Sequence, residues 1–164
     1  MRQLNHTPRG ARGLTLVELM VSLSVLAILA AAAAPYLGDM LANSRLRESG
    51  NLLFAETLIA QSEAVKRNGT VRVTTNGATV QVTDVTAADA PVVLRTRTLV
   101  QTVTAPAATF DLGPDGRPVP FGTAVAVNLG TTVTGGCTTD LRCPGLRVEA
   151  GGAIRLCGNH LETC

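Results

Sequence analysis

The stretch that decides the fold runs from Gly13 to Leu37 and reads GLTLVELMVSLSVLAILAAAAAPYL. From Leu14 onward it holds 24 residues with a single charged side chain, that of Glu18. A helix needs about 20 apolar residues to cross roughly 30 Å of hydrocarbon. So small a chain could not surround this stretch as a buried core helix. The sequence therefore predicts a membrane-spanning helix near the N-terminus.

A short basic segment precedes this helix. Arg2, Arg9 and Arg12 lie in the first 13 residues, whereas the whole chain has 14 basic and 12 acidic side chains, so the basic excess belongs to this leader. A basic start before an apolar run is also typical of a cleaved secretory signal, and Ala-x-Ala sites occur within residues 30–34. Because the apolar run exceeds the roughly 7–15 residues of a signal core, a retained anchor is favoured and signal cleavage is the alternative.

Glu18 is the one acidic side chain inside the apolar run. A carboxylate in hydrocarbon is unfavourable by a few kcal/mol near the bilayer centre and by less near its edge. Either the Glu18 side chain extends to the lipid headgroups, or it pairs with a cationic partner. Its position near the helix N-terminus is favourable for an anion because of the helix dipole. Glu18 is therefore a candidate functional residue.

The basic leader, Gly13, the Thr-Leu-Val-Glu-Leu sequence of residues 15–19 and the apolar run together resemble the processing motif of type IV prepilins and type II secretion pseudopilins. The resemblance implies that prepilin peptidase cleaves between Gly13 and Leu14 and methylates Leu14, where Phe is more usual. It implies that Glu18 meets a neighbouring subunit's N-terminal amine during assembly. It also implies that Pro35 bends the helix, as its missing N–H would. The implied partners are the peptidase, other pilins or pseudopilins, the inner-membrane assembly platform and, before assembly, membrane lipid.

The helix is expected to continue beyond the membrane. Residues 38–66 contain no Pro, and Asn68-Gly69 is a suitable stop. The apolar spacing predicts a buried face of Leu52, Ala55, Ile59 and Ser62, with Phe54, Leu58 and Val65 beside it. Charged side chains, Glu56 among them, are assigned to solvent, and Gly50 is expected to be a weak point in the helix.

Short alternating segments follow the helix. Residues 70–75 and 78–83 flank Asn76-Gly77 as a predicted hairpin. Further strands are expected at residues 92–100, 107–112, 123–129, 146–149 and 153–156, with loops at 84–91 and 113–122. Six or seven strands with one helix indicate an α+β fold, with an antiparallel sheet on the second half of the helix.

The length after the helix and the late Gly-rich hairpin are similar to the GspH/FimT family of minor pilins. The expected fold is therefore pilin-like: a long N-terminal helix, transmembrane in its first half, packed on antiparallel β-sheets with a disulfide-fastened C-terminus. The expected divisions are a leader at 1–13, the transmembrane half of the helix at 14–37, its amphipathic half at 38–67 and a periplasmic β-rich domain at 68–164.

All four cysteines lie near the C-terminus. A basic N-terminus before a span predicts an N-terminus in the cytoplasm and a C-terminal domain in the oxidising periplasm, where four cysteines indicate two disulfides. Three pairings are possible, and Cys137–Cys143 with Cys157–Cys164 is favoured because each closes a short loop. Zinc is the competing interpretation, but the C-x5-C and C-x6-C spacings do not fit its usual ligand gaps.

Enzyme chemistry finds no support in the sequence. His160 is the single histidine outside the leader and is expected at the surface, and no G-x-S-x-G, Walker A or H-E-x-x-H motif occurs. Asp111 and Asp115 flank a Gly-Pro turn and are expected to shape it. We expect no enzymatic activity, no cofactor and no metal site.

Two functions from different classes remain. The first is a minor pilin or pseudopilin, a structural subunit that helps to prime or assemble a type IV pilus or a type II secretion pseudopilus. The second is a pilus-associated subunit that binds DNA for natural transformation. Some FimT-like proteins carry a C-terminal Gly-Arg-x-Arg motif for DNA, but Gly152-Ala153-Ile154-Arg155 keeps only its final Arg. Arg142, Arg147 and Arg155 on one edge would hold two or three phosphates, so binding would be weak and easily screened by salt.

Overall fold

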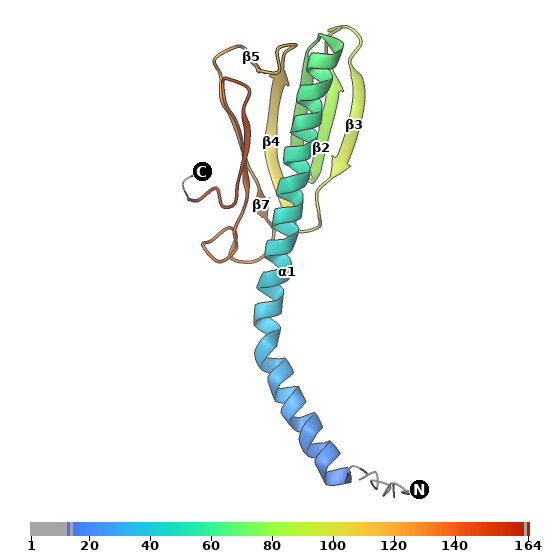
Figure 1. The fold of residues 1–164 in the computed structure, drawn as a ribbon, viewed down its shortest axis with the longest axis vertical. Coiled ribbons are helices and arrows are strands. Elements are labelled where there is room, and N and C mark those ends of the chain that lie inside the picture. The colour runs from blue at the N-terminus through green and yellow to red at the C-terminus, as the bar shows by residue number, and fades with distance from the viewer. Residues whose placement is uncertain (1–12, 14, 163) are drawn as a thin grey trace, which may run out of the picture. The chain divides into compact units, whose positions relative to one another are not determined.

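The computed structural model describes residues 13, 15–162 and 164, and its chain divides into two compact units after Leu37 (Figure 1). One helix, α1 (Leu16–Arg67), contributes to both units. Nine short strands follow it among the described residues of the second unit, residues 38–164, which we call the globular unit.

Helix α1 begins with a side-chain cap. The N–H of Glu18 donates to Oγ1 of Thr15 at 3.2 Å, which satisfies one of the backbone donors that have no partner inside the helix. Ser22 donates its hydroxyl proton to the carbonyl of Glu18 at 2.7 Å, so this polar group is satisfied without water. Residues 16–34 are apolar and long enough to cross a membrane, and none of this window is buried within the described structure.

Helix α1 ends in a Schellman motif. Asn68 adopts a φ of 50°, and its N–H donates to the carbonyl of Val65 at 3.2 Å. The N–H of Gly69 donates to the carbonyl of Ala64 at 3.0 Å. The predicted stop at Asn68-Gly69 is therefore where the helix terminates.

Arg67 ties this helix end to the sheet. Its guanidinium donates to Glu63 at 2.7 Å and to the carboxylate of Asp84 at 3.3 Å. Hydrogen bonds from the side chain and then the backbone of Thr86 hold the pKa of Asp84 below its ordinary value, and Arg67 lowers that pKa further. Asp84 therefore stays ionised and paired with the helix end down to a lower pH than an isolated carboxyl would.

The larger sheet is antiparallel and has the order β3-β2-β1-β4-β5. Its strands are β1 (Val71–Gly77), β2 (Thr79–Asp84), β3 (Val92–Thr98), β4 (Val103–Leu112) and β5 (Pro118–Val119), and β7 (Gly130–Thr131) pairs with β4. The second half of α1 lies across one face of this sheet (Figure 1). A smaller antiparallel sheet has the order β6-β8-β9, from β6 (Val125–Asn128), β8 (Gly145–Val148) and β9 (Ile154–Cys157).

The strands form antiparallel sheets, as expected, and differ from the sequence prediction in two ways. Two-residue strands occur at β5, inside a predicted loop, where it pairs with the end of β4, and at β7. Strand β7 has an edge to pair with because β4 begins at Val103, earlier than expected. The β1–β2 loop is Gly77-Ala78 and not Asn76-Gly77, since Asn76 already pairs with Thr79 and Gly77 supplies the positive φ of 59° at the first loop position.

The buried face of α1 is not the one that its large apolar residues predict. Leu58 and Val65 are exposed, as are Ala55 and Ser62. The helix instead buries a stripe of mostly small residues: Ala42, Leu46, Ser49, Gly50, Leu53, Glu56, Thr57, Ala60 and Ala64. Small side chains let the helix backbone approach the strands closely. The prediction relied on the spacing of large apolar residues, so it did not detect this face.

Glu56 was predicted to face solvent, and this prediction is wrong. Its side chain is 6% exposed and accepts hydrogen bonds from two arginines of β3. Arg95 donates to both carboxylate oxygens, at 2.9 and 3.2 Å, and Arg97 donates to one at 3.2 Å. Burial is tolerated because the paired carboxylate keeps its hydrogen bonds. Ion pairs thus hold strand β3, at the outer edge of the larger sheet, against α1. A bulge in β3 shifts its register between Val82 and Thr83 of β2.

Gly50 is the position where Pro144 packs closely against the helix, rather than a weak point in the helix. A Cβ at this position would lie 2.7 Å from Cγ of Pro144, which packs on the helix just before β8. Only glycine lets the smaller sheet reach α1 here without a shift of the proline ring.

Gln61 joins the two β regions to the helix. Its Nε2 donates to the carbonyl of Gly116 at 2.6 Å and to that of Gly152 at 2.7 Å, in two turns from different sheets. The two turns lie close together, since a Cβ on Gly152 would come within 2.7 Å of the Gly116 oxygen.

Replacing Gln61 with Leu is expected to lower the free energy of unfolding of the globular unit by about 1–3 kcal/mol, because both carbonyls lose their partner. Urea unfolding of the full chain in detergent, followed by circular dichroism, measures this. Gln81→Leu is the matched control, since its amide makes one long bond of 3.4 Å to Thr96. Equal effects for the two variants would contradict the bridging role.

Candidate functional site

The N-terminal segment carries the residues of the predicted processing motif. Gly13 is exposed, whereas Leu14, the predicted methylation site, lies outside the described residues. Glu18 is exposed in the third position of α1, close to the positive end of the helix dipole. No ion pair joins Glu18 to a cation among the described residues. A single described subunit therefore leaves this carboxylate available for a partner.

Thr15 and Glu18 also form the first half of a capping box, Thr-x-x-Glu. The observed half is the cap that Thr15 gives to the Glu18 N–H; the reciprocal half, a bond from the Thr15 N–H to the Glu18 carboxylate, would give Glu18 a local role that does not depend on another subunit. Helix α1 runs through residue 35 without a break, and the side chain of Pro35 lies outside what the structure describes.

The C-terminal region holds two disulfides. Cys137 pairs with Cys143, and Cys157 pairs with Cys164. Together they form the short-loop arrangement, one of the three that four cysteines allow. Cys143 is fully buried and belongs to the core cluster, so the first disulfide joins the 137–143 loop to the centre of the globular unit.

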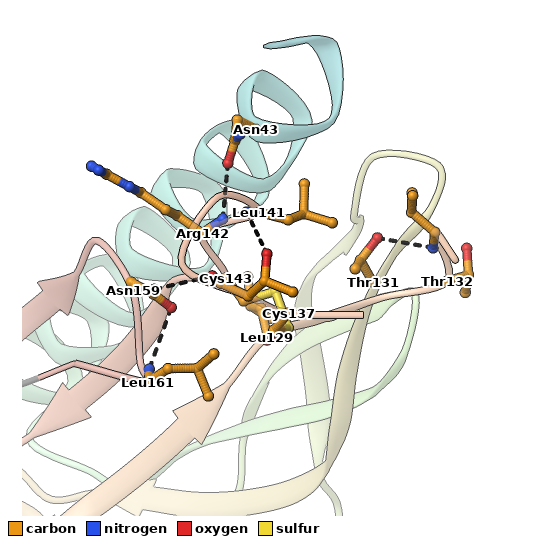
Figure 2. The surroundings of a disulfide bond; sticks show 12 residues. Asn43, Leu129, Thr131, Thr132, Cys137, Leu141, Arg142, Cys143, Asn159 and Leu161 are labelled. Carbon is orange, nitrogen blue, oxygen red and sulfur yellow. Dashed lines mark hydrogen bonds between the residues drawn. A yellow bond between two sulfur atoms is a disulfide. The ribbon is translucent and has the colours of Figure 1, made fainter. Parts of the chain in front are cut away.

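The 137–143 loop is further held by hydrogen bonds. Figure 2 shows Asn43 of α1 bonded to this loop: its Oδ1 accepts from the Arg142 N–H at 2.9 Å, and its Nδ2 donates to the Asp140 carbonyl at 2.8 Å. Buried Asn159 donates to the Thr138 carbonyl at 3.3 Å from the other side. No sequence motif marks Asn43 or Asn159. Each is an ordinary polar residue in the sequence, and only the fold brings it to the loop.

His160 lies beside the first disulfide and is partly buried rather than at the surface. Its backbone N–H donates to the carbonyl of Cys143 at 2.8 Å. Ligand atoms of Cys137, Cys143 and His160 fall within 4.8 Å of one another, but the two sulfurs are bonded to each other, so the group offers the imidazole as its one free metal ligand.

The predicted turn acids take structural roles. Both oxygens of Asp111 accept hydrogen bonds from Arg72, at 2.7 and 2.9 Å, across the β1–β4 pair. Asp115 accepts from the Arg117 N–H at 3.2 Å and so shapes its turn as predicted.

The three candidate DNA-binding arginines do not lie together. Arg147 and Arg155 face each other across β8 and β9. Arg147 donates to Asn128 at 2.7 Å, and Arg155 forms an ion pair with Glu149. Arg142 instead lines a separate cavity beside α1, because it lies in the disulfide loop before β8 and not on the hairpin. The structure thus places Arg142 beside one cavity and Arg147 with Arg155 beside another, and a DNA-binding role for these residues stays a prediction.

Comparison with known proteins gives a family motif and a fold. Residues 8–34 match the prokaryotic N-terminal methylation motif. Two crystal forms of the type IV minor pilin FimU from Pseudomonas aeruginosa strain PAO1 share the fold. The P21 form has a TM-score of 0.53 and 23% identity, covering 69% of this chain and 88% of FimU. The P65 form has a TM-score of 0.50 and 21% identity, covering 67% and 90%.

No curated protein sequence matches the chain at a significant level. The methylation motif is a property of the N-terminal sequence, whereas the likeness to FimU is one of fold. Together they describe a chain that joins the prokaryotic N-terminal methylation motif to a fold similar to that of a type IV minor pilin, with a long helix packed on antiparallel sheets.

Proposed function

We propose that the chain is a minor subunit of a type IV pilus, held in the inner membrane by the first half of α1 until it enters the fibre. The observation that carries this is the methylation motif at residues 8–34 on a chain with the minor pilin fold. Prepilin peptidase removes residues 1–13 and methylates Leu14. The globular unit then lies in the periplasm, where its two disulfides form.

The new N-terminus supplies the charge that Glu18 lacks. Cleavage after Gly13 creates an amine four residues before Glu18. In hydrocarbon an unpaired charge is strongly disfavoured, whereas opposite charges attract. A neighbouring subunit whose amine reaches Glu18 relieves both penalties at once, so the membrane itself favours assembly over isolated subunits.

The mature N-terminus tests this proposal. Mass spectrometry of the protein purified from membranes is expected to find a chain that begins at methylated Leu14 and lacks four hydrogens because of its two disulfides. A product that begins after residue 30 would mean ordinary signal cleavage and would overturn the proposal. Retention of residues 1–13 in cells with active prepilin peptidase would overturn it as well.

A pilus is proposed rather than a secretion pseudopilus because the solved structures of the same fold described above are of a type IV minor pilin. Deleting the gene is then expected to reduce surface pili and leave the secreted proteins unchanged. Lost secretion with normal pili would place the chain in a type II secretion pseudopilus, where it would help to prime or assemble that fibre.

DNA uptake remains the second candidate function, favoured by the direct register of Arg147 opposite Arg155. The ion pair of Arg155 with Glu149 and the separate position of Arg142 leave few cations for phosphate, so we expect binding only at low salt. Titration of the detergent-solubilised chain with labelled duplex at two salt concentrations, beside an Arg147→Ala/Arg155→Ala variant, measures this. Binding that persists at physiological salt and is lost in the variant would establish a DNA-uptake subunit.

A further inference from the structure

A cavity of about 640 Å³ lies between α1 and the disulfide loop, inside the globular unit. One wall is a single face of the helix, with Met40, Asn43, Ser44 and Arg47 at helical spacing. The opposite wall includes Arg142 and Asp140 of the loop, and Pro144 and Leu156 contribute apolar surface. Its volume is in the range of a binding pocket.

Neither cation of this cavity forms an ion pair with another residue that the structure describes. Most arginines that the structure describes in the globular unit form ion pairs: Arg67, Arg72, Arg95, Arg97, Arg117 and Arg155. Arg47 and Arg142 form none with any described residue, and neither does Asp140. Figure 2 shows the Arg142 side chain extending away from the disulfide, with no bond from its guanidinium to the residues drawn. The lining therefore carries two available positive charges against one negative.

The walls are fixed before any ligand arrives. Two hydrogen bonds from Asn43 and the Cys137–Cys143 disulfide hold the loop against α1. A preformed cavity avoids the cost of ordering its walls on binding, so more of the interaction energy appears as affinity.

We propose that this cavity receives an acidic side chain, carried on a segment of a neighbouring pilin subunit, between Arg47 and Arg142. This rests on the proposed function and deepens it by naming one contact that joins the subunits. Charge complementarity argues for an acid, because a carboxylate accepts the planar fork of a guanidinium. Met40, which is 71% exposed, and the apolar floor favour a protein partner, since Met and Arg are enriched at protein interfaces. A DNA duplex is disfavoured by the concave shape, the small number of cations and Asp140.

In-cell crosslinking tests this in the full chain. A photo-crosslinking amino acid replaces Ser44, which lines the cavity, or Ser62, an exposed serine further along the same helix, as the matched control. We expect Ser44 to give an adduct with another pilin subunit, at a peptide that contains Asp or Glu, and Ser62 not to give that adduct. No adduct at Ser44, or an adduct with lipid or DNA alone, would overturn the proposal.

Charge reversal provides the second arm. Arg47→Glu/Arg142→Glu is expected to reduce the Ser44 adduct roughly tenfold, the loss expected when a charge pair becomes repulsive. Arg45→Glu, an exposed helix arginine outside the cavity, is expected to leave it unchanged, and Arg47→Lys/Arg142→Lys to retain most of it. An unchanged adduct in the double reversal would refute the acidic partner. Its disulfides and circular dichroism show whether the double reversal folds. If it does not, the neutral Arg47→Gln/Arg142→Gln variant takes its place and is expected to reduce the Ser44 adduct by a smaller factor. An unchanged amount of adduct in that variant would refute the proposal.

Processing separates this inference from the proposed function. Suppose that the double-arginine variant still begins at methylated Leu14, still enters fibres and gives an unchanged amount of the Ser44 adduct. This result would refute only the proposed contact at the cavity. A chain that is never processed would refute the proposed function itself.

Discussion

Replacing Glu18 with Ala is expected to leave cleavage after Gly13 intact and to reduce incorporation of the subunit into fibres at least tenfold. The reason is that a neighbouring N-terminal amine then enters hydrocarbon unpaired, at a cost of a few kcal/mol. Immunoblots of sheared fibres against membrane fractions, with the mature N-terminus checked by mass spectrometry, measure both steps. Normal incorporation would mean that Glu18 merely tolerates the edge of the membrane.

A second variant distinguishes the two roles of Glu18. Gln at this position keeps the capping-box pattern with Thr15 but removes the charge. If pairing with the amine is what matters, Glu18→Gln fails as Ala does, whereas a capping role predicts that Gln restores assembly. Ser22→Ala is the control for a neutral change in the same apolar helix, since its hydroxyl bonds only within the helix. Defective incorporation of the Ser22 variant would show that the assay reports general damage to the helix.

Replacing Glu56 with Ala is expected to lower the free energy of unfolding by about 3 kcal/mol. Removing one member of a buried ion pair costs about 3–5 kcal/mol, and the lower end applies because the side chains of Arg95 and Arg97 are 37% and 53% exposed. Two guanidiniums would then be left against the buried Val80 and Val82, their direct neighbours on β2. Urea unfolding of the full chain in detergent measures the loss.

The matched control for this variant is Glu48→Ala, an exposed glutamate on the same helix, expected to change stability by less than about 0.5 kcal/mol. Truncating both arginines together with Glu56 should be less damaging than the sum of the separate changes, because no charge is then left unpaired. Equal losses for Glu56→Ala and Glu48→Ala would mean that the buried cluster adds nothing to stability.

Local signals in the sequence predicted most of the architecture. The apolar run, the stop at Asn68-Gly69 and the alternating strands each depend on neighbouring residues, so they can be identified without knowledge of the fold. The buried face of α1 could not be predicted in this way. Its choice depends on Ala60, Ala64 and Gly50 fitting closely against strands and Pro144, which are distant in sequence.

Among the candidate site residues, those in a contiguous motif could be predicted from the sequence, and those brought together only by the fold could not. The processing motif at Gly13 and Glu18 is contiguous and could be identified directly. Arg142 was grouped with Arg147 because it lies only five positions before it, yet the disulfide loop directs it to α1, where it shares a cavity with Arg47. Glu56 was misplaced for a similar reason, because its two partners on β3 lie 39 and 41 positions away.

The edge strand β3 has a consequence for how subunits can accumulate. An open strand edge is a template on which further chains add and grow into amyloid-like aggregates. Here Arg95 and Arg97 occupy helix-facing positions of the edge, and a bulge interrupts its register beside Leu94. Inward-pointing charge and a bulge are both devices that block such addition. Under the proposed function, subunits that await assembly are therefore protected from edge-to-edge pairing at β3.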